Sequence, residues 1–161
     1  MAKPDQMYLD KLLLYYEEEI EGEAYFAELA RTFPVPDQKA KLTLLAEVEA
    51  HAARAVEPVV AKYGLTPRAT GALVESGRAQ ARATMADWAG LLAEMNRTYP
   101  GYLDAFRSLE AMAPPEDRPR LSILTAHEEA AMRFLEIEAE RPQDSAAPLE
   151  AYLATDLVIS G

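Results

Sequence analysis

Hydrophobic residues recur at steps of three and four positions along most of this chain, with charged residues between them. That spacing places apolar side chains on one face of an α-helix. The first such stretch covers residues 5–31, and its repeating positions are Leu13, Tyr16, Ile20, Ala24, Ala27 and Ala30. Pro34 and Pro36 follow it, and proline ends a helix because it lacks a backbone donor. The pattern therefore predicts a long amphipathic helix at the start of the chain.

The same reasoning predicts further helices at residues 37–63, 67–97, 102–112 and 116–140, and a short one from 148. Asp37 is a typical N-cap for the second helix, and Gly64 supplies its C-terminal stop. Pro67 suits the first position of the third helix. The sequence Tyr99-Pro100-Gly101 is expected to separate the third helix from the short helix after it.

Short connections between long helices make neighbouring helices antiparallel. The expected fold is therefore all-α: an antiparallel four-helix bundle with a short extra helix before the last long helix and a short C-terminal helix. Half of the 161 residues are apolar, which suits one domain with a sizeable core. We expect a single domain over residues 1–161, with the bundle core at 7–140 and the short C-terminal helix and tail at 145–161.

Charge and composition narrow the function. The formal net charge of -11 repels phosphate backbones, so nucleic acid is not expected as a partner. The chain has no cysteine, which excludes disulfides and thiolate chemistry. No stretch approaches the roughly 20 apolar residues of a membrane helix, and the first residues lead into a charged helix rather than a signal peptide. We expect a cytoplasmic protein without a membrane partner.

The two histidines are the most informative residues, because each falls near the middle of a predicted long helix. In an antiparallel bundle the centres of the helices lie at one level. The candidate metal ligands at that level are Glu19, Glu47, His51, Glu75, His127 and Glu128, and Glu23 is a further candidate on the face of Glu19. Buried carboxylates are costly unless a cation neutralises them. Carboxylate and imidazole together therefore predict a metal site inside the bundle.

Three stretches carry a resemblance to a known family: Glu19–Phe26, Glu47–Ala52 and Ala126–Leu135. They resemble the ligand helices of the ferritin-like di-iron carboxylate superfamily, which includes the rubrerythrins. The resemblance implies one or two iron ions, with manganese as the alternative. It also implies an oxygen- or peroxide-dependent oxidoreductase acting on a small molecule. The family places histidine three residues after a ligand glutamate. Here Glu47 and His51 are four apart and His127 precedes Glu128, so one metal, two or none stay open.

Two other functions fit the same residues. The first is a bundle without catalysis that serves binding or assembly as a homodimer, with the histidines hydrogen-bonded to glutamate or tyrosine. The second is a metal-independent enzyme that uses His51 with Glu47, or His127 with Glu128, as an acid–base pair.

Overall fold

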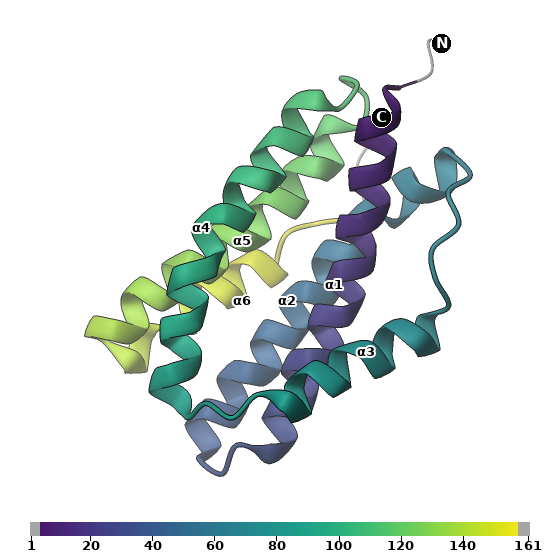
Figure 1. The fold of residues 1–161 in the computed structure, drawn as a ribbon. Helices are drawn as coiled ribbons and strands as arrows, with labels where there is room; N and C mark the ends of the chain where they lie inside the picture. The colour runs from purple at the N-terminus through teal and green to yellow at the C-terminus, as the bar shows by residue number, and fades with distance from the viewer. Residues whose placement is uncertain (1–3, 158–161) are drawn as a thin grey trace.

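A computed structural model describes residues 4–157 of the chain, and within this range it contains α-helices, one short 3-10 helix and no strand (Figure 1). The α-helices are α1 (Gln6–Thr32), α2 (Pro36–Lys62), α3 (Thr70–Ala83), α4 (Trp88–Met112), α5 (Arg118–Glu140) and α6 (Ala147–Leu153). The 3-10 helix η1 (Pro142–Asp144) joins α5 to α6. The predicted all-α class is confirmed, whereas the last four residues of the predicted tail lie outside the described residues. None of the helices in residues 4–157 is long and apolar enough to span a membrane.

The first two helices begin and end close to the predicted positions. Asp5 caps α1, because its side chain accepts a hydrogen bond from the backbone N–H of Met7 at 3.0 Å. Proline in the connection separates α1 from α2, and the two helices run antiparallel (Figure 1). The N-cap of α2 is Val35, so the prediction of Asp37 as the cap was wrong; Asp37 lies in the first turn, where an acidic side chain faces the positive end of the helix dipole.

The boundaries of the two following helices differ from the prediction. The helix α3 already ends at Ala83, and α4 starts at Trp88 after the side chain of Asp87 accepts from the N–H of Gly90 at 2.9 Å. The prediction of a break at Pro100 was wrong, because α4 continues through it to Met112. Pro100 is exposed, and the apolar stripe runs past it without losing its spacing; its positions are Leu91, Met95, Leu103 and Phe106. Burial of this stripe compensates for the hydrogen bond that the proline removes.

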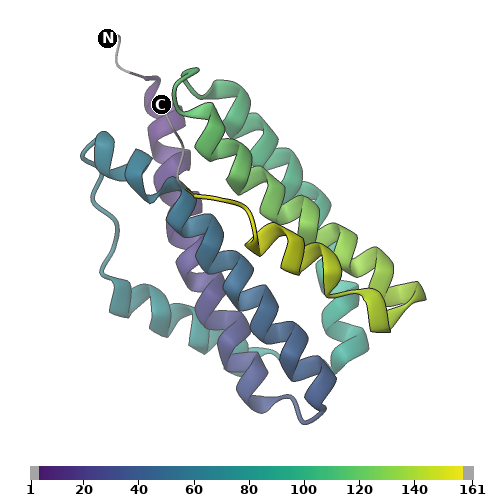
Figure 2. The same ribbon diagram turned by 180° about the vertical axis from the view of Figure 1, so that it is seen from behind.

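The long helices pair as two hairpins, α1 with α2 and α4 with α5, which pack together mainly through α2 and α5. The short helix α6 lies across α2 and α5, and α3 lies on the outer side of α1 (Figure 2). By contrast, α1 and α4 approach each other at few points. The helices α1 and α4 therefore pack against each other less closely than α2 and α5 do.

A buried carboxylate joins the helices at one end of the body. Asp117, at the start of α5, accepts hydrogen bonds from the hydroxyls of Tyr8 at 3.0 Å and Tyr63 at 2.5 Å, and from Lys62 at 2.7 Å. These partners belong to the beginning of α1 and the end of α2. The pKa of the Tyr63 phenol is raised by burial and by its bond to Asp117, so this tyrosine stays a donor.

A second buried network holds the other end. The ammonium of Lys41 on α2 lies 2.8 Å from Glu138 on α5, and both side chains are almost fully buried. Glu138 also accepts from the indole of Trp88 at 3.2 Å and from the hydroxyl of Ser145 at 2.6 Å. Hydrogen-bonded polar groups thus connect the two hairpins at both ends. The predicted metal site lies between these two ends.

Candidate metal centre

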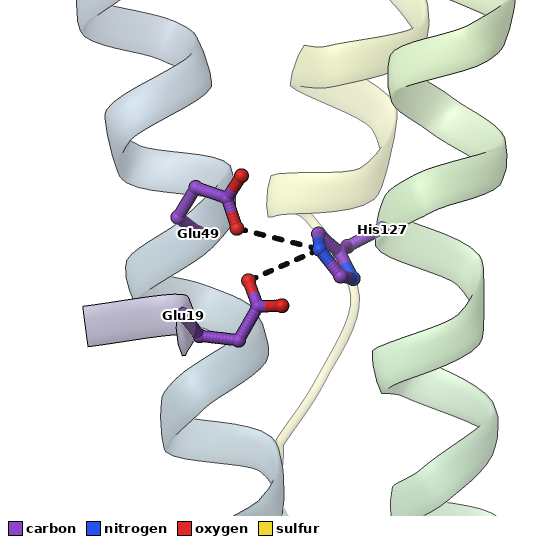
Figure 3. A group of neighbouring side chains, drawn as sticks. All are labelled: Glu19, Glu49 and His127. Carbon is purple, nitrogen blue, oxygen red and sulfur yellow. Dashed lines mark ion pairs between the residues drawn. The ribbon is translucent and has the colours of Figure 1, made fainter. Parts of the chain in front are cut away.

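Three side chains from three helices meet at the middle of the body: Glu19 of α1, Glu49 of α2 and His127 of α5 (Figure 3). The Nε2 atom of His127 lies 3.0 Å from Oε2 of Glu19 and 3.3 Å from Oε2 of Glu49. One potential ligand atom of each residue lies within 4.8 Å of the other two. A single ion could therefore contact all three.

Glu128 adds a third carboxylate next to this group. Its Oε2 atom lies 3.6 Å from Nε2 of His127. Glu19, His127 and Glu128 are each less than 5 % exposed. Oε2 of Glu19 and Oε1 of Glu128 nevertheless have no hydrogen-bond partner within the described residues. Buried polar atoms are rarely left in this state, so a bound cation or a retained proton is expected at these two oxygens.

The hairpin geometry explains why Glu19 and Glu49 meet. Both lie 15 residues from Pro34 in the connection, in opposite directions along the chain, so antiparallel pairing brings them to the same level. Gly22 leaves room for the second carboxylate, because a Cβ atom there would lie only 3.1 Å from Cδ of Glu49. A glycine at this position thus lets Glu49 reach across the face of α1 to the cluster.

The ring of His127 is oriented by its surroundings. Its Nδ1 atom contacts the backbone carbonyl oxygen of Leu124, one turn earlier in α5. A carbonyl oxygen only accepts, so Nδ1 carries the proton and Nε2 faces the carboxylates. The ring of Phe106 packs against the imidazole with centroids 5.1 Å apart. In the neutral form of His127, Nε2 therefore directs its lone pair at the centre of the cluster, which is the orientation of a metal ligand.

Burial and mutual interaction shift the acidity of every member of the cluster. Burial raises the pKa of Glu128 to about 8, and it also raises the pKa of Glu19, which Glu49 raises further. Burial disfavours ionisation of Glu49 too, but the neighbouring Glu19 and His127 outweigh it and lower the pKa of Glu49. Burial likewise opposes the charge on His127, yet the neighbouring carboxylates raise the pKa of its imidazole well above the ordinary value. Without a cation, this cluster retains protons that would ordinarily dissociate.

The distances suit a divalent cation. Two ligand atoms about 2.1 Å from one ion and at right angles to each other are about 3.0 Å apart. The 3.0 and 3.3 Å separations around Nε2 of His127 match such an edge. Carboxylate oxygen together with imidazole nitrogen favours iron, manganese or zinc over calcium, which takes oxygen ligands only. The residues present therefore fit a transition metal.

A cavity of about 740 Å³ leads from the cluster to the surface between α1 and α4. Glu19, Glu49, His127 and Glu128 all line it. Tyr99 also lines it, and burial together with Glu128 and Glu49 raises the pKa of its phenol well above the ordinary value. A small molecule can thus reach the cluster through this cavity. The phenol of Tyr99 in the cavity wall stays neutral.

Three of the six predicted ligands lie together at this centre: Glu19, His127 and Glu128. Glu47 does not, because it is exposed on the outer side of α2, and Glu23 is exposed as well. Glu75 is also on the surface, where it pairs with Arg82 at 2.6 Å. The expectation that all six converge on one layer is therefore corrected for Glu47 and Glu75.

His51 is buried but faces a different neighbour. Its ring packs against Tyr152 of α6 with centroids 5.0 Å apart, and Tyr152 in turn lies 6.4 Å from the ring of His127. The hydroxyl of Tyr152 donates to the carbonyl of Ile123 at 3.0 Å. The side chain of Tyr152 therefore contacts both histidines, and His51 is not part of the carboxylate cluster. The Nε2 atom of His51 has no hydrogen-bond partner within the described residues.

Glu49 is the member of the cluster that the sequence analysis missed. The choice of Glu47 and His51 rested on their common helical face. The buried stripe of α2 instead includes Leu45, Ala52 and Val56, and Glu49 lies four residues after the first and three before the second. Helical spacing therefore places Glu49, and not Glu47, on the core side. Strict use of that spacing would have identified it.

Comparison with known proteins found no match to this chain among protein-family models, curated proteins or solved structures.

Proposed function

We propose that this protein is a ferritin-like four-helix bundle that binds one iron or manganese ion between Glu19, Glu49, His127 and Glu128. The observation that carries the proposal is the pair of buried, unpartnered carboxylate oxygens beside the Nε2 atom of His127. Three carboxylates held close together in the protein interior are costly when ionised, and a divalent cation offsets that cost. The same four side chains would then fill most of a coordination shell.

One ion fits the chain better than two. The two-metal pattern of the family needs a second histidine, and the ring of His51 packs on Tyr152 instead. Glu47 and Glu75, which would supply the second ion, are exposed. The described residues offer one group of carboxylate and imidazole ligands. The proposed centre is accordingly mononuclear.

The cavity favours a catalytic role over a purely structural metal. A structural site is closed by protein ligands, whereas a catalytic site keeps a side open to solvent or substrate. Here the cavity reaches all four ligands. Bound iron would supply redox chemistry with oxygen or peroxide. The chain's own part is to fix the ligands, to hold the Nδ1 proton of His127 on Leu124, and to admit a small molecule between α1 and α4. The proposed activity is oxidation of that molecule.

A bundle without a metal is the second candidate, and one observation favours it. His127 lies within 3.6 Å of three carboxylates, and two of them, Glu19 and Glu49, raise the pKa of its imidazole well above the ordinary value, although burial opposes this. Protons held on His127, Glu19 and Glu128 could therefore replace a cation. A protein of this kind would serve as a binding or assembly module, as a homodimer for example.

Metal content distinguishes the two candidates. Untagged protein from iron-supplemented cells is analysed by inductively coupled plasma mass spectrometry, alongside His127→Asn and the control His51→Asn. We expect about one iron or manganese per chain in the wild-type protein and in His51→Asn, and loss of the metal in His127→Asn. Wild-type protein that contains no metal, and takes up none from ferrous or manganous salts, would refute the metal proposal. Oxygen consumption after ferrous iron is added to metal-free protein then tests the oxidation.

A further inference from the structure

The cavity between α1 and α4 has a strongly acidic lining. Among the described residues, six glutamates and one histidine line it, and no lysine or arginine does; the glutamates are Glu18, Glu19, Glu21, Glu49, Glu94 and Glu128. Two of them are neutralised by neighbours outside the cavity. Glu21 pairs with Arg68 at 3.1 Å, and Glu94 pairs with Arg97 at 2.5 Å. The other four have no lysine or arginine partner within the described residues.

A divalent cation at the floor does not cancel this charge. Glu19, Glu49 and Glu128 together carry three negative charges when ionised, and His127 as a ligand is neutral. The floor therefore stays negative by one charge, and Glu128, whose buried Oε1 atom has no hydrogen-bond partner within the described residues, lines the same cavity. Glu18 adds another negative charge where the cavity opens, because this residue is exposed. In the metal-free protein Glu19 and Glu128 retain protons, so the negative charge that then favours a cationic ligand is that of Glu18 at the opening.

Aromatic rings form another part of the wall. The cavity is lined by Tyr25, Phe26, Tyr99, Tyr102 and Phe106. Tyr99 and Tyr102 lie with ring centroids 6.1 Å apart and planes inclined by 64°. Tyr102 is 48 % exposed although it is a large aromatic residue, so its ring is available at the opening. Aromatic faces attract ammonium groups, and they do so more strongly where water is partly excluded.

We propose that this cavity binds an organic cation, namely an amine or quaternary ammonium compound with an apolar body. Glu18 and the ring of Tyr102 would hold the ammonium group at the opening. The apolar body would lie deeper, against Met95 and Phe106, which are buried and line the same cavity. A volume of about 740 Å³ is within the range of small-molecule sites. This inference rests on the proposed function, because it names the class of small molecule that would reach the metal centre.

Matched probes test the charge of the ligand separately from its shape. Isothermal titration calorimetry at pH 7 compares 4-phenylbutylamine, a cation, with 4-phenyl-1-butanol, which is neutral and of similar size. Both are titrated into the full chain with EDTA and, separately, with one equivalent of Mn²⁺. The variants are Glu18→Gln and Tyr102→Leu. The control is Glu23→Gln, since Glu23 is an exposed carboxylate on the same helix that does not line the cavity.

We expect the amine to bind at least about tenfold more tightly than the alcohol, under both metal conditions. Glu18→Gln and Tyr102→Leu should each weaken the binding of the amine about three- to tenfold and leave the affinity for Mn²⁺ unchanged. Glu23→Gln should bind the amine as tightly as the wild-type protein does. Equal binding of amine and alcohol, or no binding of either, overturns the inference. Amine binding that Mn²⁺ abolishes also overturns it, because the amine would then occupy the carboxylate cluster. The affinity for Mn²⁺, measured in the same samples, tests the metal proposal independently.

Discussion

Glu49 and His127 belong to different helical hairpins, yet Oε2 of Glu49 lies 3.3 Å from Nε2 of His127. Gly22 leaves the space that Glu49 needs, and Leu124 fixes the ring of His127. The contact therefore depends on the packing of α1, α2 and α5 together. Any change that shifts one hairpin against the other should be detected first at this pair.

The position of Glu49 gives the sharpest prediction for metal binding. Glu49→Gln removes a charged ligand but keeps the size of the side chain, whereas Glu47→Gln makes the same change two residues away on the exposed side of α2. We expect Glu49→Gln to lower the affinity for Mn²⁺ by at least about tenfold, because even residues that only orient a metal ligand contribute that much. Glu47→Gln should leave it unchanged. Calorimetric titration of metal-free protein measures both, and equal affinities would exclude Glu49 as a ligand.

Glu128 should make the metal-free protein less stable as the pH rises. Its pKa of about 8 in the folded chain exceeds the ordinary value of 4.5, so between these pH values the folded state binds more protons than the unfolded state. The free energy of unfolding must then fall as pH increases through that window, by about 1.4 kcal/mol for each unit of pKa difference at most. In Glu128→Gln the free energy of unfolding should depend less on pH. The variant should be more stable than the wild type at pH 8.5, and this difference should be much smaller at pH 5.

Urea unfolding in EDTA at the two pH values measures this effect. Glu129→Gln is the matched control, because Glu129 is the exposed neighbour on the same helix. If Glu128→Gln and Glu129→Gln showed the same change of stability with pH, the raised pKa of Glu128 would be contradicted.

Gly77 determines how closely α3 approaches α1. A Cβ atom at this position would overlap the backbone carbonyl oxygen of Glu21 and lie 2.9 Å from Cβ of Ala24. Gly77→Ala should therefore push α3 away from α1, at a cost of about 1–3 kcal/mol. Hydrogen exchange of the α3 amides should become faster. Gly71→Ala tests the same substitution in the same helix with no heavy atom within 4 Å, and better helix propensity should stabilise it by up to about 1 kcal/mol. Equal protection of α3 in the two variants would contradict this contact.

Lys41 and Glu138 form a buried ion pair at 2.8 Å. Removing Lys41 alone should lower the free energy of unfolding more than replacing both residues. Lys41→Met leaves the Glu138 carboxylate buried without its cation, which should cost about 3–5 kcal/mol in urea unfolding. Adding Glu138→Gln removes the stranded charge and keeps a partner for Trp88, so the double variant should regain part of the loss. A double variant as unstable as Lys41→Met would indicate that the charge of Glu138 is not the cause.

The sequence predicted those elements whose apolar spacing is strong. The stripe of α5, with Leu121, Leu124 and Leu135 buried, placed Glu128 in the interior correctly. The end of α3 was not predicted, because α3 buries only Leu73, Gly77 and Ala81, and this sparse pattern runs without contrast into the small residues that follow. Its end depends on Asp87 capping the next helix, a local hydrogen bond that competes with helical continuation.

The candidate site was predictable where a residue's own helix decides its environment. His51 lies at the middle of α2 and is buried as expected, but what it meets is set by α6, a short helix far along the chain. Periodicity in α2 carries no information about the position of Tyr152. The separation of the two histidines into different environments therefore required the three-dimensional structure.

The carboxylate cluster takes Glu19 and Glu49 from the first hairpin and His127 and Glu128 from the second. Between these hairpins in sequence lies the segment with α3 and the linker at residues 84–87. A cation bound there would act as a crosslink between two halves of the polypeptide. If the chain were cut in the linker, reassembly of the two fragments would become dependent on metal concentration, and fragment complementation would report occupancy of the site directly.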